Sequence, residues 1–300
     1  MKIIIALFST LLLMGWSFDV AAFSCLAEGK NVGKGSVNIR VNLTPTINVG
    51  QNLVVDLSQS IQCKNDSKPP APPIIDYINL VKGSAFGGAL ANFKGSVTWY
   101  GNNYPLPTEG PSSNYTIIDT NYKPLQSQLY LKPIGSAGGV VIKAGDLVAI
   151  LLMHKDSSDH HPYDFIWKIY SNNDVVVPTG GCDVSARDVT VTLPDYPATM
   201  AVPVTVHCAQ NQSLAYYLTG TTADSANSIF TNNASASPAQ GIGVQMTRNG
   251  TAVPANSNVS LGTVSTSPVN LGLTATYART SGQVTAGNVQ SIIGVTFVYQ

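Results

Sequence analysis

A short polar segment carries several side chains whose types could do chemistry. Asp156, Asp159, His160 and His161 belong to the residue types that bind metal ions or form acid–base pairs. The rest of the chain offers no Cys-x-x-Cys pair, no Gly-x-Ser-x-Gly motif and no phosphate-binding loop to complete such a site. We therefore interpret the segment as a solvated loop, and we expect no enzyme activity, no cofactor and no metal.

The four cysteines have a spacing that suggests disulfide bonds. Cys25 and Cys63 form one close pair, and Cys182 and Cys208 form another after a long gap. In an exported protein, disulfides are the default state of such cysteines. The spacing predicts the bonds Cys25–Cys63 and Cys182–Cys208, one in each half of the chain.

The amino terminus has the pattern of an export signal. Met1-Lys2 supplies a positive charge, and Ile3 to Trp16 is an apolar run. The run is shorter than the roughly 20 residues that span a membrane. Small residues at Val20-Ala21-Ala22 suit signal peptidase. The sequence predicts a signal peptide over residues 1–22, with cleavage before Phe23 and export through the periplasm.

The composition excludes some classes of partner. The formal net charge is zero, and only 11% of the residues are charged. A protein that follows the phosphates of nucleic acid, or that docks on anionic lipid, needs an excess of positive charge. We therefore expect no nucleic-acid partner.

Alternation of apolar and polar residues with period two predicts β-strands throughout the chain. Asn249-Gly250 is a hairpin signal. The predicted strands include residues 37–43, 189–193, 202–208, 242–246 and 271–277. No convincing amphipathic helix is present, so the predicted fold class is all-β, built as sandwiches or barrels.

Pro178-Thr179-Gly180-Gly181 marks the predicted domain boundary. Proline interrupts strand pairing, and glycine allows any backbone angle. The expected organisation is a first domain over residues 23–178, a linker over 179–181 and a second domain over 182–300.

The last residues of the chain form one more predicted strand, and one of its faces is almost wholly apolar. A final strand usually needs a neighbour or a cover. It either closes a sandwich as an ordinary edge strand or pairs with another protein. The residues on this face are Val289, Ser291, Ile293, Val295, Phe297 and Tyr299.

Several segments make the chain resemble the two-domain tip adhesins of chaperone–usher pili, which include the mannose-binding type 1 fimbrial adhesins. The similar segments are Val41 to Leu43, Asn48 to Leu57 and Asn172 to Cys182, together with most of residues 182–300. The resemblance covers essentially the whole mature chain. It implies two immunoglobulin-like β-sandwiches, an elongated lectin domain followed by an incomplete pilin domain, at the extracellular fimbrial tip.

The resemblance also gives the second domain its partners. Pilins of this family have a glycine 14 positions from the end and a penultimate tyrosine, here Gly287 and Tyr299. Their sandwich lacks its last strand, which a periplasmic chaperone supplies before the next pilus subunit replaces it at the outer-membrane usher. The resemblance therefore implies that Ile293, Val295 and Phe297 receive a donated strand.

In the first domain, the resemblance implies a sugar-binding site for a host glycan or glycoprotein. The processed amine of Phe23 and the side chains of Asn65, Asp66 and Asp76 match positions of the mannose-binding adhesins. Carboxylates and amides suit sugar hydroxyls because they accept and donate hydrogen bonds. On their own, Asn65-Asp66 would suggest a turn.

The other half of that site departs from the mannose-binding pattern. A gapless alignment from Trp167 puts His154, Asp156, His161 and Tyr163 where those adhesins have Gln, Asn, Asp and Phe. With a loop shortened by two residues, Lys155 instead matches a lysine of sister adhesins that bind galactose or N-acetylgalactosamine. We therefore predict a galactose-type sugar.

Two alternatives remain beside that prediction. The first is a mannose-specific adhesin, and the second is a structural tip subunit that has lost sugar binding. The family also implies that docking of the two domains weakens sugar binding, with the short linker from Pro178 to Gly181 as the hinge.

Overall fold

The computed structural model describes residues 23–32, 35–67 and 74–300. The predicted signal peptide and the proline-rich segment from Lys68 to Pro73 lie outside the described residues. Within the described ranges, no helix is long and apolar enough to cross a membrane.

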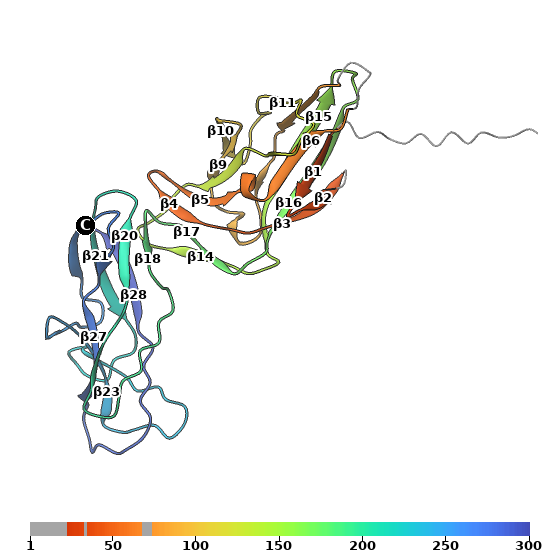
Figure 1. The fold of residues 1–300 in the computed structure, drawn as a ribbon. Coiled ribbons are helices and arrows are strands. Elements are labelled where there is room, and N and C mark those ends of the chain that lie inside the picture. The colour runs from red at the N-terminus through yellow and green to blue at the C-terminus, as the bar shows by residue number, and fades with distance from the viewer. Residues whose placement is uncertain (1–22, 33–34, 68–73) are drawn as a thin grey trace, which may run out of the picture.

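The described part of the first half of the chain contains strands of different lengths and two single-turn 3-10 helices (Figure 1). Their bounds are β1 Phe23–Ala27, β2 Lys30–Val32, β3 Ser36–Val41, β4 Thr46–Asn48, β5 Gln51–Asp56, η1 Leu57–Gln59, β6 Ile61–Asn65, β7 Asp76–Leu80, β8 Ala85–Phe86, η2 Gly88–Leu90, β9 Gly95–Trp99, β10 Asn102–Leu106, β11 Tyr115–Ile117, β12 Lys123–Pro124, β13 Ser127–Leu131, β14 Gly139–Ile142, β15 Leu147–Ser157, β16 Tyr163–Ser171 and β17 Val175–Pro178.

The described regular structure of the second half consists of strands. Their bounds are β18 Cys182–Val184, β19 Thr199–Ala201, β20 Thr205–Cys208, β21 Gln212–Thr219, β22 Ile229–Phe230, β23 Ile242–Arg248, β24 Thr251–Ala252, β25 Val259–Val264, β26 Val269–Asn270, β27 Leu273–Arg279 and β28 Gly294–Tyr299. The predicted all-β class is therefore confirmed.

Three sheets build most of the first half. Their strand orders are β12-β6-β1-β2, β10-β9-β13-β5-β4 and β11-β7-β15-β16-β3, and β14 pairs separately with β17. The long strands β15 and β16 form an antiparallel pair, while β3 joins β16 in parallel. The sheets in the second half have the orders β18-β20-β26, β19-β27-β23-β22 and β25-β21-β28.

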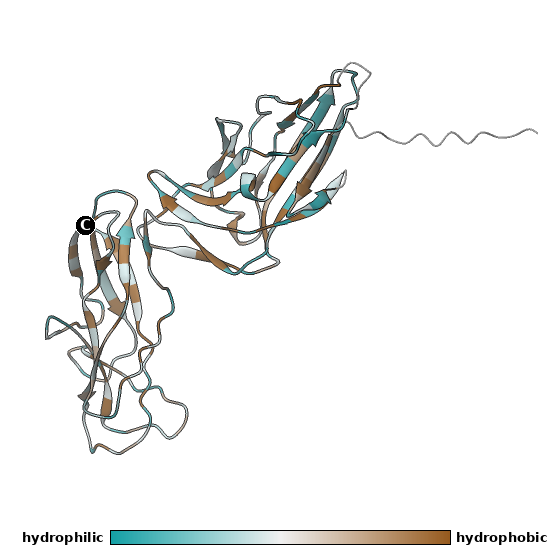
Figure 2. Ribbon diagram, viewed as in Figure 1, coloured by the Kyte–Doolittle hydropathy of each residue, from teal (hydrophilic) through white to brown (hydrophobic). Residues whose placement is uncertain are grey.

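Two separate hydrophobic cores divide the molecule. The first core runs from Phe23 to Val177, with Trp99 and Trp167 fully buried. The second runs from Cys182 to Ala275. Apolar and polar residues alternate along several strands, as the predicted period-two pattern requires (Figure 2). Each body has a core of its own, which is the property expected of a domain.

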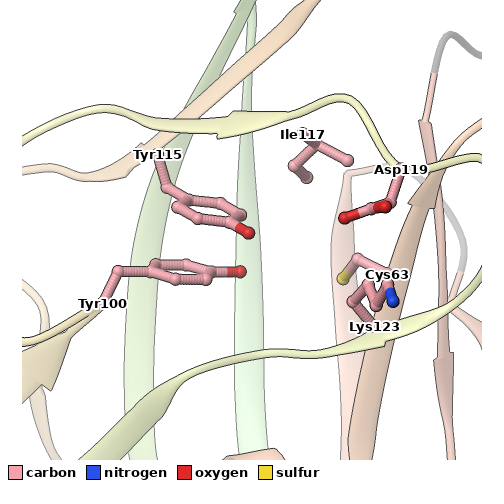
Figure 3. A pocket seen from close by; sticks show the side chains of 6 residues that line it. All are labelled: Cys63, Tyr100, Tyr115, Ile117, Asp119 and Lys123. Atoms are coloured by element: carbon pink, nitrogen blue, oxygen red, sulfur yellow. The ribbon is translucent and has the colours of Figure 1, made fainter.

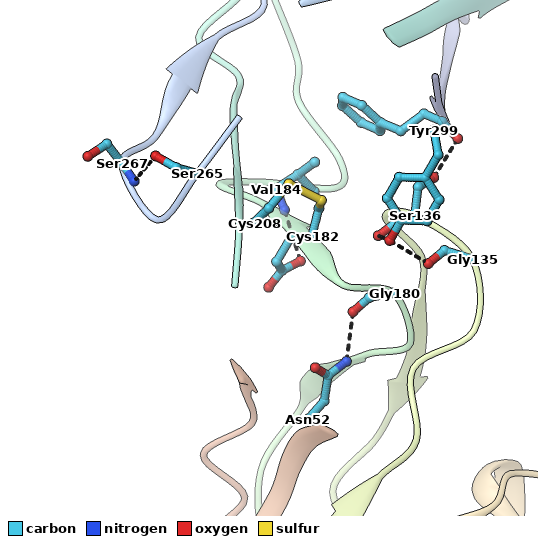
Figure 4. Close-up of a disulfide and its surroundings, with 12 residues drawn as sticks. Asn52, Gly135, Ser136, Gly180, Cys182, Val184, Cys208, Ser265, Ser267 and Tyr299 are labelled. Carbon is cyan, nitrogen blue, oxygen red and sulfur yellow. Dashed lines mark hydrogen bonds between the residues drawn. A yellow bond between two sulfur atoms is a disulfide. The ribbon is translucent and has the colours of Figure 1, made fainter. Parts of the chain in front are cut away.

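Both predicted disulfides are present. Cys25 lies directly opposite Cys63 on neighbouring strands, and Cys182 lies opposite Cys208. The second bond joins β18 to β20 immediately after the junction between the two bodies (Figure 4).

The predicted hairpin at Asn249-Gly250 is confirmed between β23 and β24. Both residues have positive φ angles, 51° and 79°, as a type I′ turn requires. Glycine and asparagine reach this region at low cost, which explains why this pair stands at the turn.

One predicted strand is wrong. β18 ends at Val184 and β19 begins at Thr199, so residues 189–193 form no strand. The alternation was nevertheless meaningful, because Val189, Val191 and Leu193 are half-buried against the second core. A segment becomes a strand only when a neighbour supplies hydrogen bonds, and no described strand lies beside this one.

Four further predicted strands are shorter than expected. β3 ends at Val41, so residues 42–43 form no strand, and β27 begins at Leu273, so residues 271–272 form none. Residues 202–204 form no strand, and Pro203 lacks the N–H that a ladder needs, so β20 begins only at Thr205. At the C-terminus, β28 covers Gly294–Tyr299 but not residues 289–293.

Candidate functional site

A buried ion pair lies at the end of the first domain. Asp76 opens β7 with no exposed surface, and Lys155 on β15 is 2% exposed. Lys155 Nζ lies 2.9 Å from Asp76 Oδ1. The register pairs Ser157 with Asp76 and Lys155 with Ile78, so Lys155 is the diagonal neighbour of Asp76 on the same face.

Competing effects act on the Asp76 carboxyl group. Burial raises its pKa, and the hydrogen bond and positive charge of Lys155 oppose that rise. The negative charges of Asp159 and Asp66 raise the pKa further, and the net shift is upward. A carboxylate and an ammonium held together in this way can accept and donate hydrogen bonds to ligand hydroxyls.

Asn65 ties three strands together beside Asp76. Its Nδ2 donates to Asp76 Oδ2 at 3.0 Å, to Ile74 O at 2.7 Å and to Ile117 O at 3.0 Å. Its Oδ1 accepts the backbone N–H of Ser67 at 2.8 Å. The predicted sugar-binding residue Asn65 therefore orients Asp76, because its own amide group is already fully engaged.

Phe23 occupies the neighbouring strand. It opens β1 opposite Asn65, and its ring is 8% exposed with its centroid 6.0 Å from that of Phe165. A hollow of about 290 Å³, open to solvent, lies on this side and is lined by Phe23, Tyr163, Phe165 and Trp167 among others. The ring anchors the strand, so cleavage before Phe23 would leave a free amine next to Asn65.

Tyr163 covers the ion pair from β16. It lies opposite Lys155, whose Nζ is 5.6 Å from the centre of the tyrosine ring. Burial, with a contribution from the negative charge of Asp76, raises the pKa of Tyr163 to about 12. The phenol therefore remains a neutral donor and acceptor at physiological pH.

The structure separates His154 and Asp156 from this group. Met153, Lys155 and Ser157 are buried, whereas His154 and Asp156 lie on the opposite face of β15. His154 Nδ1 instead lies 2.7 Å from Asp164 Oδ1. Of the residues that the two alignments point to on β15, Lys155 therefore faces inward beside Asp76, and His154 and Asp156 face the other way.

The polar segment that follows β15 is held by its own side chains. His161 Nδ1 lies 3.1 Å from Asp159 Oδ2, and the His161 N–H donates to Ser157 Oγ at 3.2 Å. The Ser157 hydroxyl and His161 hold the pKa of Asp159 below its usual range. His161 is 77% exposed, so it lies at the rim of the site rather than beside Asp76.

Sequence reasoning missed Ser157 in this region. It is 1% exposed, pairs with Asp76 in the strand register and bonds to Asp159. The alternation from Met153 onward was the signal that could have identified it. No cluster of three or more potential metal ligands occurs in the described parts of the chain.

A smaller hollow lies on the flank of the same domain (Figure 3). Stacked Tyr100 and Tyr115 rings line it, with Asp119 and Lys123 opposite. Its volume of about 230 Å³ includes open solvent, as does the 290 Å³ of the hollow beside Phe23. Its lining contains none of the predicted sugar-binding residues, so the region around Phe23 and the buried ion pair is the stronger candidate for a binding site.

The second candidate region is the last strand, β28. Within the described chain it pairs only with β21, so its other edge has no strand beside it. Ile293 and Phe297 pack against the second core, while Val295 and Tyr299 remain 37% and 44% exposed. An open edge with apolar side chains is a template for another strand.

Gly287 lies just before this strand at a point of close backbone contact. A Cβ atom there would lie 2.5 Å from both Ser237 O and Ala239 N. Glycine is therefore required sterically, since no backbone neighbour can move aside cheaply.

The two domains touch where β28 ends (Figure 4). Ser136 Oγ donates to Phe297 O at 2.7 Å, and the Tyr299 hydroxyl donates to Gly135 O at 2.9 Å. Asn52 Nδ2 binds the carbonyls of Pro178 and Gly180 at 2.9 and 2.8 Å. A loop of the first domain is thus bonded directly to the last strand of the second.

Comparison with known proteins identifies the family to which the two domains belong. Residues 25–168 match the family model "FimH, mannose binding", and residues 172–300 match the model "Fimbrial protein". Over its whole length the chain is 59% identical to the type 1 fimbrin D-mannose specific adhesin of Escherichia coli K12, covering 100% of both proteins. The chain belongs to the FimH family of fimbrial adhesins.

One further fimbrial protein and one solved structure are less similar to this chain. The chain is 38% identical to the S-fimbrial protein subunit SfaH of E. coli O6:K15:H31, covering 94% of this chain and 99% of that protein. A chaperone–tip adhesion subunit complex from archaic Csu pili of Acinetobacter baumannii is 10% identical with a TM-score of 0.28, covering 91% of this chain and 99% of that one. That score adds nothing to the fold described above.

Family membership confirms several predictions. The chain is a two-domain fimbrial adhesin, with a first domain of the mannose-binding FimH type and a second of the fimbrial protein type. The matched families are adhesin and fimbrial proteins rather than enzymes. The predicted galactose-type sugar has no such support, because the relative with 59% identity is named as mannose-specific.

Proposed function

We propose that this adhesin attaches bacteria to host glycans by binding a terminal hexose at the tip of its first domain. The observation that carries this proposal is the buried Asp76, held by Asn65 and Lys155 where β7 and β15 meet. Phe23 lies alongside on β1. An open hollow lined by Phe23 and Tyr163 adjoins these fixed polar groups, a combination that suits a small ligand with many hydroxyls.

Mannose is the first sugar to test. The relative with 59% identity is a D-mannose specific adhesin, and the matched domain model carries the same description. Galactose-type sugars remain a second candidate because of one observation, the buried ammonium of Lys155 beside Asp76. The Lys155 ammonium can only donate hydrogen bonds, whereas a glutamine side chain can both donate and accept them. A lysine here therefore favours a different arrangement of sugar hydroxyls from the one a glutamine would bind.

The two separate cores and the two adjoining family matches support a division into two domains. We assign the lectin domain to residues 23–178, the linker to 179–181 and the pilin domain to 182–300. The open edge of β28 would receive a strand from a periplasmic chaperone, and then from the next subunit at the usher. Gly287, Ile293, Val295, Phe297 and Tyr299 are the residues assigned to that contact.

A glycan panel probed with the mature chain, purified with its chaperone, tests the sugar. Binding that methyl α-mannoside blocks supports mannose. Binding that only galactosides block supports the second candidate. No binding to any glycan, with a correctly folded complex, would overturn the lectin proposal and favour a structural tip subunit.

A further inference from the structure

Four polar side chains form a cluster on the outer face of the sheet that carries Phe23. Ser24 and Lys64 lie directly opposite one another on β1 and β6, one residue away from the Phe23–Asn65 pair. Asp66 follows β6, and Tyr122 precedes β12, which pairs with β6 at Lys123 and Cys63. Lys64 and Asp66 are only 29% and 23% exposed, so the cluster is partly withdrawn from solvent.

The contacts of Asp66 are concentrated on one of its oxygens. Lys64 Nζ lies 3.1 Å from Asp66 Oδ1, and Ser24 Oγ donates to the same oxygen at 3.2 Å. Asp66 Oδ2 accepts no hydrogen bond from the residues that the structure describes. A carboxylate has about four acceptor positions, so an oxygen with none of them used can accept from a ligand.

Tyr122 braces both groups that hold Asp66. Its hydroxyl lies 3.3 Å from Ser24 Oγ, and its ring centre lies 5.1 Å from Lys64 Nζ. The ammonium therefore sits between a carboxylate and an aromatic face, an arrangement that restricts a long flexible side chain. The hydrogen bond and charge of Asp66 raise the pKa of Lys64, which agrees with the short distance.

We propose that Lys64, Ser24 and Tyr122 are positioning residues that hold Asp66 by Oδ1 and leave Oδ2 to accept a hydrogen bond from a sugar hydroxyl. This inference rests on the proposed lectin function. Asp66 follows Asn65, the last residue of β6. The Asn65 side chain points into the domain and donates a hydrogen bond to Asp76 Oδ2. The two carboxylates are thus fixed from opposite sides, Asp76 from within the domain and Asp66 from its surface.

The test is sugar affinity of the mature chain in its chaperone complex, measured with the glycan that binds best in the panel. Lys64→Met is expected to weaken binding about tenfold, the usual effect of losing a charge-assisted hydrogen bond that fixes a ligand contact. Lys64→Arg should restore affinity to within about threefold, because guanidinium also binds a carboxylate. Lys143→Met, which breaks an exposed pair with Asp174, is the matched control and should change affinity less than twofold.

A double-mutant cycle separates positioning from a general structural effect. In an Asp66→Asn background, Lys64→Met should cause no further loss of affinity, since its effect passes through that carboxylate. Full additivity, or unchanged affinity in Lys64→Met, would overturn the inference. If Asp76→Asn abolishes binding while Lys64→Met does not weaken it, the inference alone fails; if Asp66→Asn and Asp76→Asn both bind normally, the proposed site fails.

Discussion

The lectin tip and the last strand of the pilin domain are prepared for binding in opposite ways. At the tip, charged groups are buried and already paired, as in Asp76 with Lys155. At β28, apolar side chains are half exposed and one backbone edge has no strand beside it. A small polar ligand needs fixed hydrogen-bonding groups in place beforehand, whereas a missing strand brings its own backbone ladder and side chains.

This difference predicts where each region is vulnerable. The tip depends on charge balance, so removing one charge leaves the other buried without a partner. The pilin domain depends on a close backbone approach at Gly287 and on the open edge of β28, so adding atoms there is more harmful than removing charge.

The largest expected effect concerns the buried pair. Lys155→Met should lower the free energy of unfolding of the lectin domain by about 3–5 kcal/mol, because Asp76 loses its cation. Urea denaturation of residues 23–178, which have their own core, measures this change.

Two variants control that measurement. The double variant Lys155→Met/Asp76→Leu should recover most of the stability, since two apolar groups can replace a buried pair. Lys143→Met should cost less than about 1 kcal/mol because its pair is exposed. A loss below about 1 kcal/mol in Lys155→Met would show that the pair is not buried as described.

A somewhat smaller effect is expected at Gly287. Gly287→Val should destabilise the pilin domain by about 1–3 kcal/mol and reduce the yield of chaperone complex, because its Cβ would collide with Ser237 O and Ala239 N. Gly110→Val, where a Cβ would meet nothing within 4 Å, is the matched control. Normal thermal unfolding and complex yield for Gly287→Val would refute the steric explanation.

The junction between the two regions should respond more modestly. Ser136→Ala removes the hydrogen bond to Phe297 O, typically about 0.5–1.5 kcal/mol. If docking weakens sugar binding, this variant should bind its glycan about threefold more tightly, and the isolated lectin domain more tightly still. Equal affinities for wild type, variant and isolated domain in calorimetry would contradict coupling.

The smallest expected effect is on how stability varies with pH, where Asp76 and Asp224 should act in opposite directions. Burial raises the pKa of Asp76, so its contribution to stability falls as pH rises from the ordinary value of 3.8 through the raised value. Burial also acts on Asp224 in the pilin domain, but Ile229 N–H and Ser228 hold its pKa below normal. Its contribution is present above the ordinary value and is lost as pH falls.

Melting curves between pH 3 and 6 distinguish the two carboxylates. Asp224→Asn should reduce the acid sensitivity of the pilin domain, whereas Lys155→Met/Asp76→Leu should remove a loss of lectin stability that appears as pH rises. The same sign for both domains would contradict the contrast drawn above.

Local patterns predicted much of the fold because their physical causes are local. Period-two alternation located strands such as β23, and positive φ at Asn249-Gly250 followed from residue type. The strand predicted at Val189–Leu193 is absent because a strand also needs a hydrogen-bonded neighbour, and no strand of the described residues pairs with this segment. The alternation therefore predicted which side chains pack against the core, but not strand pairing.

The site was harder to predict because its residues meet through strand register. Asp76 and Lys155 come together only after β7 pairs with β15, and a shift of one residue exchanges Lys155 for His154. The cluster of Ser24, Lys64 and Tyr122 could not be predicted from the sequence either, because its residues come from β1, β6 and the segment before β12.

The measurement that tests the central claim most directly is the affinity of Asp76→Asn for the best-binding glycan, with the mature protein in its chaperone complex. The account predicts a loss of about 100-fold, because a buried charged acceptor is replaced by a neutral amide beside Lys155. Asp174→Asn, at an exposed carboxylate paired with Lys143, should bind like wild type. Affinity of Asp76→Asn within twofold of wild type would contradict a sugar site at this tip.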